Sequence, residues 1–315
     1  MIVNKAAIKS LASLLFLSIL LMYASCSRTA GEMANSDGRM NIVTTTGMIE
    51  DIVKNIVQDS ADVISLMGPG VDPHLYKATQ GDLKRLKDAS LIFYNGLHLE
   101  GKLGDIFKNL GKIKLVMAVS DDIPRERLIN NTTMGGQYDP HIWFDVSLWK
   151  EAATYVSQSL IKNDSINGPY YAQNTATYLL KLDSLHAYVK QKITEIPQDQ
   201  RIMVTAHDAF EYFGQAYNIR VEALQGISTM SEFGSRDVVD LVNFITEKKI
   251  KAVFVESSVP EKYIRSVVEG CRKKGHEVII GGTLYSDAMG NKGTPAGSYI
   301  GMVRTNVNTI VNALK

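Results

Sequence analysis

The chain has 315 residues, of which 45% are hydrophobic and 21% are charged, and its formal net charge is +1. A chain of this length and composition is long enough for two globular lobes or domains. The near-zero charge provides no net field toward nucleic acid, so we expect no nucleic-acid partner.

The N-terminal segment is predicted to be an export signal. Lys5 and Lys9 form a positive start, and residues 11–23 form an apolar run. This run is too short to span a bilayer, and small residues follow it. We therefore expect residues 1–25 to be a signal peptide. Loss of the two lysines reduces the 34 basic side chains to 32, against 33 acidic ones.

Cys26 follows the apolar run in the sequence YASC, which resembles a bacterial lipobox, although Tyr23 stands where leucine is usual. We expect lipidation of Cys26, and we expect residues 26–39, which contain few apolar side chains, to tether the protein to a membrane. The alternative is cleavage near Ala24, which leaves Cys26 as a free thiol. The only other cysteine is Cys271, so lipidation excludes a disulfide.

From residue 40 the chain alternates short β-branched or apolar runs with helical patterns, one of which has Ile49, Ile52 and Ile56 on one face. This alternation indicates parallel sheets covered on both faces. We predict an α/β fold with two lobes, at residues 40–166 and 198–315, each a roughly four-stranded parallel sheet flanked by helices. The strands are expected at residues 41–46, 62–67, 90–94, 114–118, 201–205, 220–224, 251–255 and 277–280.

One long helix is predicted to join the lobes over residues 167–197. Pro169 suits its first turn, an apolar stripe runs from Tyr171 to Ile193, and Pro197 ends it. About 27 residues at 1.5 Å per residue span roughly 40 Å, enough to run along both lobes. Such a rigid connection permits small tilts of the lobes rather than a wide hinge movement.

Histidines occur where predicted strands end. His74 and His141 each lie in an Asp-Pro-His tripeptide, in which proline restricts the backbone. His207 directly follows a strand, and Asp287 lies just past another. Ligands of open α/β sheets bind beyond the carboxyl ends of strands, which is where His74 and His207 stand.

These four side chains form a chemically sensible metal site in the cleft, with two ligands from each lobe. Neutral imidazole suits zinc and other late first-row ions, while carboxylate oxygen suits manganese. Sequence position alone does not show whether these four side chains form a metal site or have unrelated roles, because a histidine at a strand end is more often structural.

Two carboxyl groups and the remaining histidines have other expected roles. Glu256 and Asp208 lie near strand ends and are predicted to orient the imidazoles, although Glu256 also suits a simple salt bridge. His98 is expected to line the cleft. His186 is expected at the surface or packed between the lobes, and His276 in solvent.

The chain resembles the metal-receptor family of ABC importers for zinc and manganese, also called solute-binding family 9, over nearly all of residues 40–315. The segments that carry the resemblance are GPGVDPHLY at 68–76, YNGLHLEGKL at 94–103, DPHIWFD at 139–145, TAHDAFEYF at 205–213, GTLYSDAM at 282–289 and GSYIGMVRTNVNTI at 297–310. The resemblance implies two lobes joined by a rigid helix, in agreement with the strand and helix pattern.

The resemblance also implies that His74, His141, His207 and Asp287 are the metal ligands. Many manganese receptors of the family have glutamate where this chain has His207, and the segment 121–137 lacks the histidine-rich loop of many zinc receptors. Both Mn²⁺ and Zn²⁺ therefore stay open. Because imidazoles bind metal only when neutral, affinity is expected to fall below about pH 6.5.

The implied function is capture of the ion outside the cytoplasmic membrane and delivery to an ABC permease with its ATPase, by a monomer that is not an enzyme. The chain contains no GxxxxGK[ST] phosphate loop and is therefore not that ATPase. Two alternatives belong to other classes. A zinc hydrolase needs an open water position at the metal, which four protein ligands would close. An adhesin-type surface lipoprotein would use the metal structurally.

Overall fold

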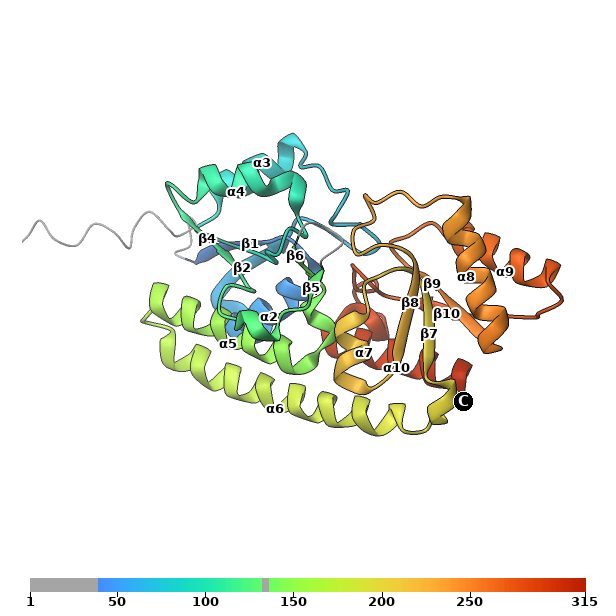
Figure 1. Cartoon of the computed structure of the whole chain (residues 1–315). Coiled ribbons are helices and arrows are strands. Elements are labelled where there is room, and N and C mark those ends of the chain that lie inside the picture. The colour runs from blue at the N-terminus through green and yellow to red at the C-terminus, as the bar shows by residue number, and fades with distance from the viewer. Residues whose placement is uncertain (1–38, 132–135) are drawn as a thin grey trace, which may run out of the picture.

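The computed structural model describes residues 39–131 and 136–315, which form two α/β lobes along one long helix (Figure 1). The expected signal peptide, Cys26 and the tether up to residue 38 lie outside the described residues. All eight predicted strands are present. They are β1 Met40–Thr44, β2 Ala61–Ser65, β3 Leu91–Tyr94, β4 Leu115–Ala118, β7 Ile202–His207, β8 Arg220–Gln225, β9 Ala252–Glu256 and β10 Ile279–Leu284.

Helices connect and cover these strands. They are α2 Gly47–Val57, α3 Gln80–Asp88, α4 Gly104–Leu110, α5 Val146–Asn163, α6 Gly168–Ile193, α7 Glu211–Tyr217, α8 Ser235–Lys248, α9 Lys262–Lys273 and α10 Tyr299–Leu314. A short antiparallel pair that was not predicted, β5 Asn130–Asn131 and β6 Gln137–Tyr138, precedes α5. Within the described ranges, no helix is both long and apolar enough to cross a membrane.

The N-terminal lobe contains a four-stranded parallel sheet in the order β2-β1-β3-β4. In the C-terminal lobe the strands form two parallel pairs, β7–β8 and β9–β10, and β7 packs beside β9. The buried Glu256, at the end of β9, joins the two pairs, because its Oε1 accepts the backbone N–H groups of Ala206 and His207 at 2.8 Å each. This carboxylate therefore fixes the carboxyl end of β7.

Successive strand residues point to opposite faces and enter different hydrophobic cores. In β1, Ile42 faces the core shared with α2, α5, α6 and α10, whereas Val43 faces the core under α3 and α4. In β9, Phe254 faces the shared core and Val253 faces the core under α8 and α9. The shared core is continuous between the lobes, so both sheets rest on one apolar layer.

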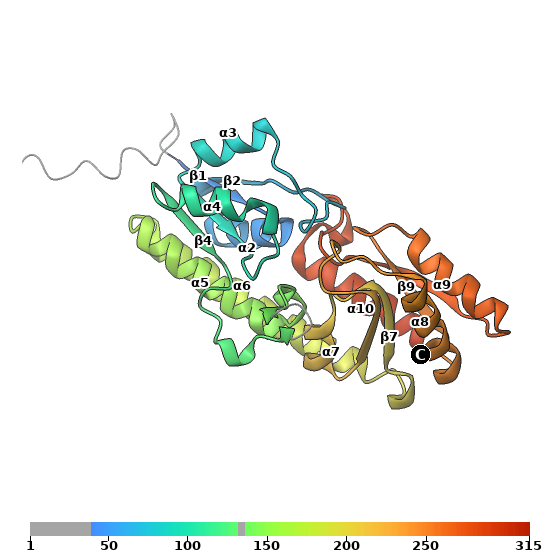
Figure 2. The same ribbon diagram turned by 45° about the horizontal axis from the view of Figure 1, so that its top comes forward.

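Helix α6 runs along both lobes, beside α5 and α10 (Figure 2). Its stripe from Tyr171 to Ile193 is buried, as the spacing predicts, and Pro169 stands in its first turn. Its 26 residues span about 39 Å at 1.5 Å per residue. Because this helix and the core above it are common to both lobes, the carboxyl edges of the two sheets face each other in a defined geometry.

Strand β10 differs most from its predicted bounds, since it extends to Leu284 rather than ending at residue 280. Gly281 and Gly282 suggest a turn in the sequence, but they lie within the strand. A Cβ at Gly281 would approach Ala313 of α10 to 2.6 Å, and Gly282 has φ +143° at a register shift. The glycines therefore permit close packing of α10 on the strand. Asp287 remains in the loop that directly follows.

Candidate metal centre

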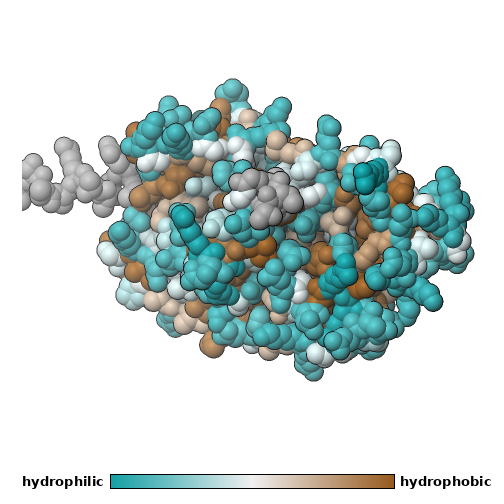
Figure 3. Space-filling view, in the orientation of Figure 1, coloured by the Kyte–Doolittle hydropathy of each residue, from teal (hydrophilic) through white to brown (hydrophobic). Residues whose placement is uncertain are grey.

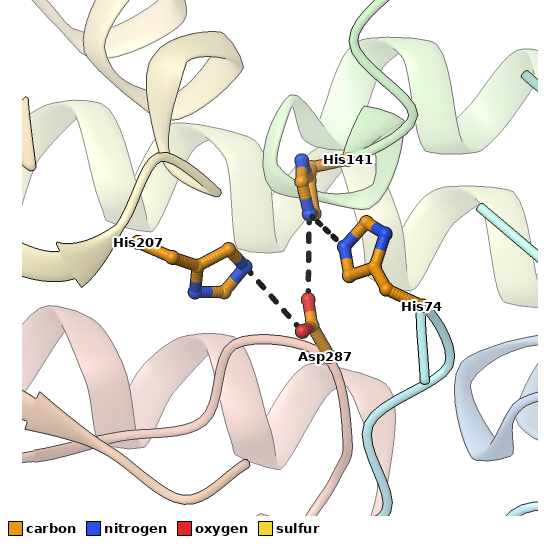
Figure 4. A group of neighbouring side chains, drawn as sticks. All are labelled: His74, His141, His207 and Asp287. Atoms are coloured by element: carbon orange, nitrogen blue, oxygen red, sulfur yellow. Dashed lines mark hydrogen bonds and ion pairs between the residues drawn. The ribbon is translucent and has the colours of Figure 1, made fainter. Parts of the chain in front are cut away.

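Four loops and strand ends converge where the lobes meet (Figure 4). His74 lies in the loop after β2, and His141 lies between β6 and α5. His207 is the last residue of β7, and Asp287 lies in the loop after β10. The structure thus brings together all four side chains that the sequence singled out, two from each lobe.

The ligand atoms are close enough to share one ion. Nε2 of His74 lies 3.3 Å from Nε2 of His141, which lies 3.4 Å from Oδ1 of Asp287. Nε2 of His207 lies 3.4 Å from Oδ2 of the same carboxylate, and all four residues offer ligand atoms within 4.8 Å of one another. A tetrahedral ion with bonds of about 2.0–2.1 Å separates its ligand atoms by about 3.3–3.4 Å. The three contacts therefore match the spacing that an ion requires.

The centre is buried and its polar atoms lack ordinary partners. His141 and His207 are fully buried, and Asp287 and His74 are 1% and 3% exposed. Among the described residues, Nε2 of His207 and both oxygens of Asp287 have no hydrogen-bond partner. Because buried polar atoms are normally satisfied, unpartnered atoms that point at one another indicate a site that binds a cation. The two oxygens of Asp287 face different imidazoles, so both can serve as donors.

Buried carboxylates contact Nδ1 of two of the three imidazoles, the ring nitrogen that does not face the other ligands. Nδ1 of His207 lies 2.5 Å from Oε2 of Glu256, and Nδ1 of His141 lies 2.7 Å from Oδ1 of Asp139. A carboxylate at Nδ1 places the proton there and leaves the Nε2 lone pair free for a metal.

Asp139 takes the position that the sequence analysis assigned to Asp208. Among the described residues the Asp208 carboxylate makes no hydrogen bond to an imidazole. Its backbone N–H donates to the carbonyls of Gln225, the last residue of β8, and Gly226. Asp139 has a signal in the sequence that was overlooked. In both Asp-Pro-His tripeptides the aspartate accepts the backbone N–H of the histidine two residues later, at 2.9 Å for His141 and 2.8 Å for His74. This local turn is typical of aspartate.

The other histidines lie outside the centre. His98 lines a separate pocket of about 570 Å³ in the N-terminal lobe rather than the cleft. His186 on α6 bonds the Tyr217 hydroxyl at 3.0 Å, and Nε2 of His276 lies 2.8 Å from the carbonyl of Ile250. The partners of His186 and His276 explain these two side chains without a metal.

Burial and charge act in opposite directions on two of the ligands. Burial lowers the pKa of His74 to about 3, more than the attraction of Asp287 raises it. Burial alone would raise the pKa of Asp287, but the nearby imidazoles of His207 and His141 hold it well below its ordinary value. Asp287 is therefore ionised and His74 is neutral in neutral solution.

The two imidazoles with carboxylate partners behave differently from His74. Burial alone would lower the pKa of His141, but Asp139 and then Asp287 raise it to about 9. The same opposition, with Glu256 in place of Asp139, puts the pKa of His207 well above its ordinary value. Without metal, both imidazoles are therefore protonated on both ring nitrogens at neutral pH and carry a positive charge.

Glu256→Gln is expected to weaken metal binding by about 10–100-fold, as removal of such supporting groups does in other metal sites. The single amide oxygen must still accept the N–H groups of Ala206 and His207, which turns the amide NH₂ toward Nδ1 of His207. That favours the tautomer with the proton on Nε2, which cannot bind metal. Calorimetric titration of the purified variant measures the loss.

Glu100→Gln is the matched control. Glu100 and Glu256 are each 4% exposed, and Glu100 also accepts two backbone N–H groups, from Asn95 and Gly96, but no imidazole. Equal losses of affinity in the two variants would show that Glu256 acts only through the stability of the fold.

Two α/β lobes that meet over a buried ligand centre are the architecture of two-lobed solute-binding proteins. Because this centre consists of three imidazoles and one carboxylate, the solute that it suits is a metal ion. The chain belongs to the ZnuA family, described as zinc-uptake complex component A, periplasmic, whose model matches residues 42–313. The family expected from the sequence motifs is thereby confirmed. It is a family of uptake components, in agreement with the expectation that the chain is not an enzyme.

Some relatives of this chain are named for manganese and others for zinc. The chain is 48% identical over 287 residues to the manganese-binding lipoprotein MntA of Bacillus subtilis, covering 91% of this chain and 93% of that protein. It is 47% identical over 281 residues to the zinc-binding protein TroA of Treponema pallidum, covering 89% and 91%. The solved structure of TroA matches with a TM-score of 0.85, over 87% of this chain and 98% of that one. The fold is therefore that of the family.

Proposed function

We propose that this protein captures Mn²⁺ or Zn²⁺ outside the cytoplasmic membrane, with His74, His141, His207 and Asp287 as its ligands, and delivers the ion to an ABC permease. The observation that carries the proposal is the set of converging, buried ligand atoms, of which Nε2 of His207 and both oxygens of Asp287 have no hydrogen-bond partner in the described part of the chain. The family and the names of the relatives support uptake as the purpose of binding.

The donor set suits both candidate ions. Three imidazole nitrogens favour Zn²⁺, while a carboxylate with two available oxygens raises the possible coordination number and suits Mn²⁺. The relatives do not separate the two, because the manganese-binding and the zinc-binding protein are 48% and 47% identical to this chain. We therefore assign the ion as manganese or zinc, with the choice made by metal supply as well as by the site.

Delivery requires no chemical bond to be made or broken by this chain. The receptor docks on its permease, and the ATPase of the importer supplies the energy. Lipidation of Cys26 would hold the receptor at the membrane surface, as the name lipoprotein states for MntA. We also propose that the protein acts as a monomer. The face in Figure 3 is largely hydrophilic, and its apolar residues form small separate patches, so this face offers no large apolar surface to a second copy.

An adhesin-type role in which the metal is structural is the alternative. It separates from uptake in a binding assay, because adhesion that survives loss of the metal ligands is an independent function.

The test is metal titration of residues 27–315, stripped with chelator. We expect one ion per chain for Mn²⁺ and Zn²⁺ by calorimetry and native mass spectrometry. We expect His141→Ala to bind at least about tenfold more weakly, because a ligand is lost and Asp139 is left without its imidazole. The variant should keep the circular dichroism spectrum of the parent. No binding above background in the parent would refute the proposed site.

A further inference from the structure

His74 is held differently from the other two imidazoles. Nδ1 of His141 and of His207 each lie against a buried carboxylate, but among the described residues no hydrogen bond reaches Nδ1 of His74. His74 is positioned through its backbone, whose N–H donates to Oδ1 of Asp72 at 2.8 Å. It is also the most exposed of the four ligands, at 3%. The placement of this ligand therefore depends on the conformation of its loop.

Asp72 connects that loop to the other lobe. While Oδ1 holds the backbone of His74, Oδ2 accepts the Thr229 hydroxyl at 2.6 Å. Thr229 lies in the loop between β8 and α8 of the C-terminal lobe. Its carbonyl accepts a hydrogen bond from Nε2 of Gln225 at 2.7 Å. Gln225 in turn pairs with His207 in the register of strands β7 and β8. One path of contacts therefore runs from a ligand of one lobe to a ligand of the other.

The His74 loop also has room to move. Gly70 has φ +72°, a left-handed conformation that glycine adopts freely. Gly68, Pro69 and Val71 line a groove of about 530 Å³ between the lobes. By contrast, His207 ends a buried strand, and Trp143, two residues after His141, donates its indole N–H to the carbonyl of Ser286 at 3.0 Å. Of the three imidazoles, His74 is therefore the one whose loop borders open space.

Resting on the proposed function, we propose that the Thr229–Asp72 hydrogen bond is a latch across the cleft that keeps His74 in its ligating position, and that the ion leaves when this latch opens. Asp72 and Thr229 are positioning residues, since neither contacts the ion. Because the ion leaves only after this hydrogen bond breaks, the latch sets the rate of release.

The test is the rate of ion release. We expect Thr229→Val, which keeps the shape of threonine but removes the hydroxyl, to release Mn²⁺ or Zn²⁺ about tenfold faster, since it breaks a hydrogen bond to a charged group. Thr229→Ser keeps the hydroxyl and should release at the parental rate. Stopped-flow mixing of the metal-loaded, full-length protein with excess chelator, followed by tryptophan fluorescence, measures the rate. The Trp143 ring lies 5.2 Å from that of His141 and reports on the site.

A double-mutant cycle separates the latch from general destabilisation. Asp72→Ala should release the ion faster still, because it also frees the backbone of His74. Adding Thr229→Val to it should change the rate no further.

Parental release rates in Thr229→Val, equal acceleration by serine and valine, or additive effects of the two substitutions would each overturn the latch. Absence of metal binding in the parent would instead overturn the proposed function, so the two failures are distinguishable.

Discussion

Asp287→Asn is expected to weaken Mn²⁺ and Zn²⁺ binding at least about 100-fold, a loss of about 2.8 kcal/mol in binding free energy. The substitution keeps the size of the side chain but removes the only anionic ligand and one of its two donor oxygens. A divalent ion would then lie in a fully buried site with no anionic ligand of its own, since the carboxylates of Asp139 and Glu256 contact only the far nitrogens of the imidazoles. Competition with a chromogenic chelator measures affinities over the required range.

Asp208→Asn is the matched control, because Asp208 is a half-buried aspartate near the same imidazoles. Attraction to His141 and His207 reaches its carboxyl group, but burial and repulsion by Asp139 raise its pKa to about 6, and it makes no hydrogen bond to a ring. We expect this variant to bind within about threefold of the parent, since a charge without ligand contact contributes little beyond a screened field. Equal losses in both variants would argue for a general effect of negative charge instead of ligation by Asp287.

The fold was predictable because its determinants are local. Runs such as residues 251–255 contain residues suited to a strand buried on both faces, and β9 buries all five of its residues, Ala252–Glu256. The stripe from Tyr171 to Ile193 follows the helical period and is buried along α6. Strand ends then place His207 and Asp287 at a common edge, since parallel strands end on the same side of a sheet.

What escaped prediction depends on contacts between distant segments. Glu256 is expected near the imidazoles from the sequence, but its particular partner, His207, lies 49 positions away in the chain, and Thr229 reaches Asp72 across 157. No periodicity records such pairs. The extension of β10 through Gly281 was hidden for the same reason, because its cause is the approach of Ala313 on α10. Asp139 is the exception, since its turn with His141 lies within one tripeptide.

Charge balance explains how three carboxylates can lie together in a buried centre before metal arrives. Asp139, Glu256 and Asp287 are each in contact with an imidazole, and His141 and His207 hold protons at neutral pH. Two protonated imidazoles against three carboxylates give a net charge of about −1. A divalent ion bound by neutral imidazoles leaves the same charge, so two protons leave as two positive charges enter.

Metal binding near pH 7 is therefore expected to release about two protons, and the apparent affinity is expected to rise about 100-fold per pH unit. The sign follows from competition: protons on His141 and His207 occupy the site when the pH is below their pKa, so binding weakens as pH falls. With the pKa of His141 at about 9, the part of this dependence that comes from His141 should persist through pH 8 and end only above about pH 9. Ordinary histidines would give a flat affinity above about pH 6.5.

Calorimetry in buffers of different ionisation enthalpy counts the released protons directly. When the observed binding enthalpy at pH 7.0 is plotted against the ionisation enthalpy of the buffer, the slope gives the number of protons released per ion. We expect a slope of about two. Glu256→Gln is the informative comparison, because loss of this carboxylate lowers the pKa of His207 and should bring the count toward one. A count near zero at pH 7.0 in the parent would show that its imidazoles are already neutral. The buried carboxylates would then need another source of positive charge before the metal binds.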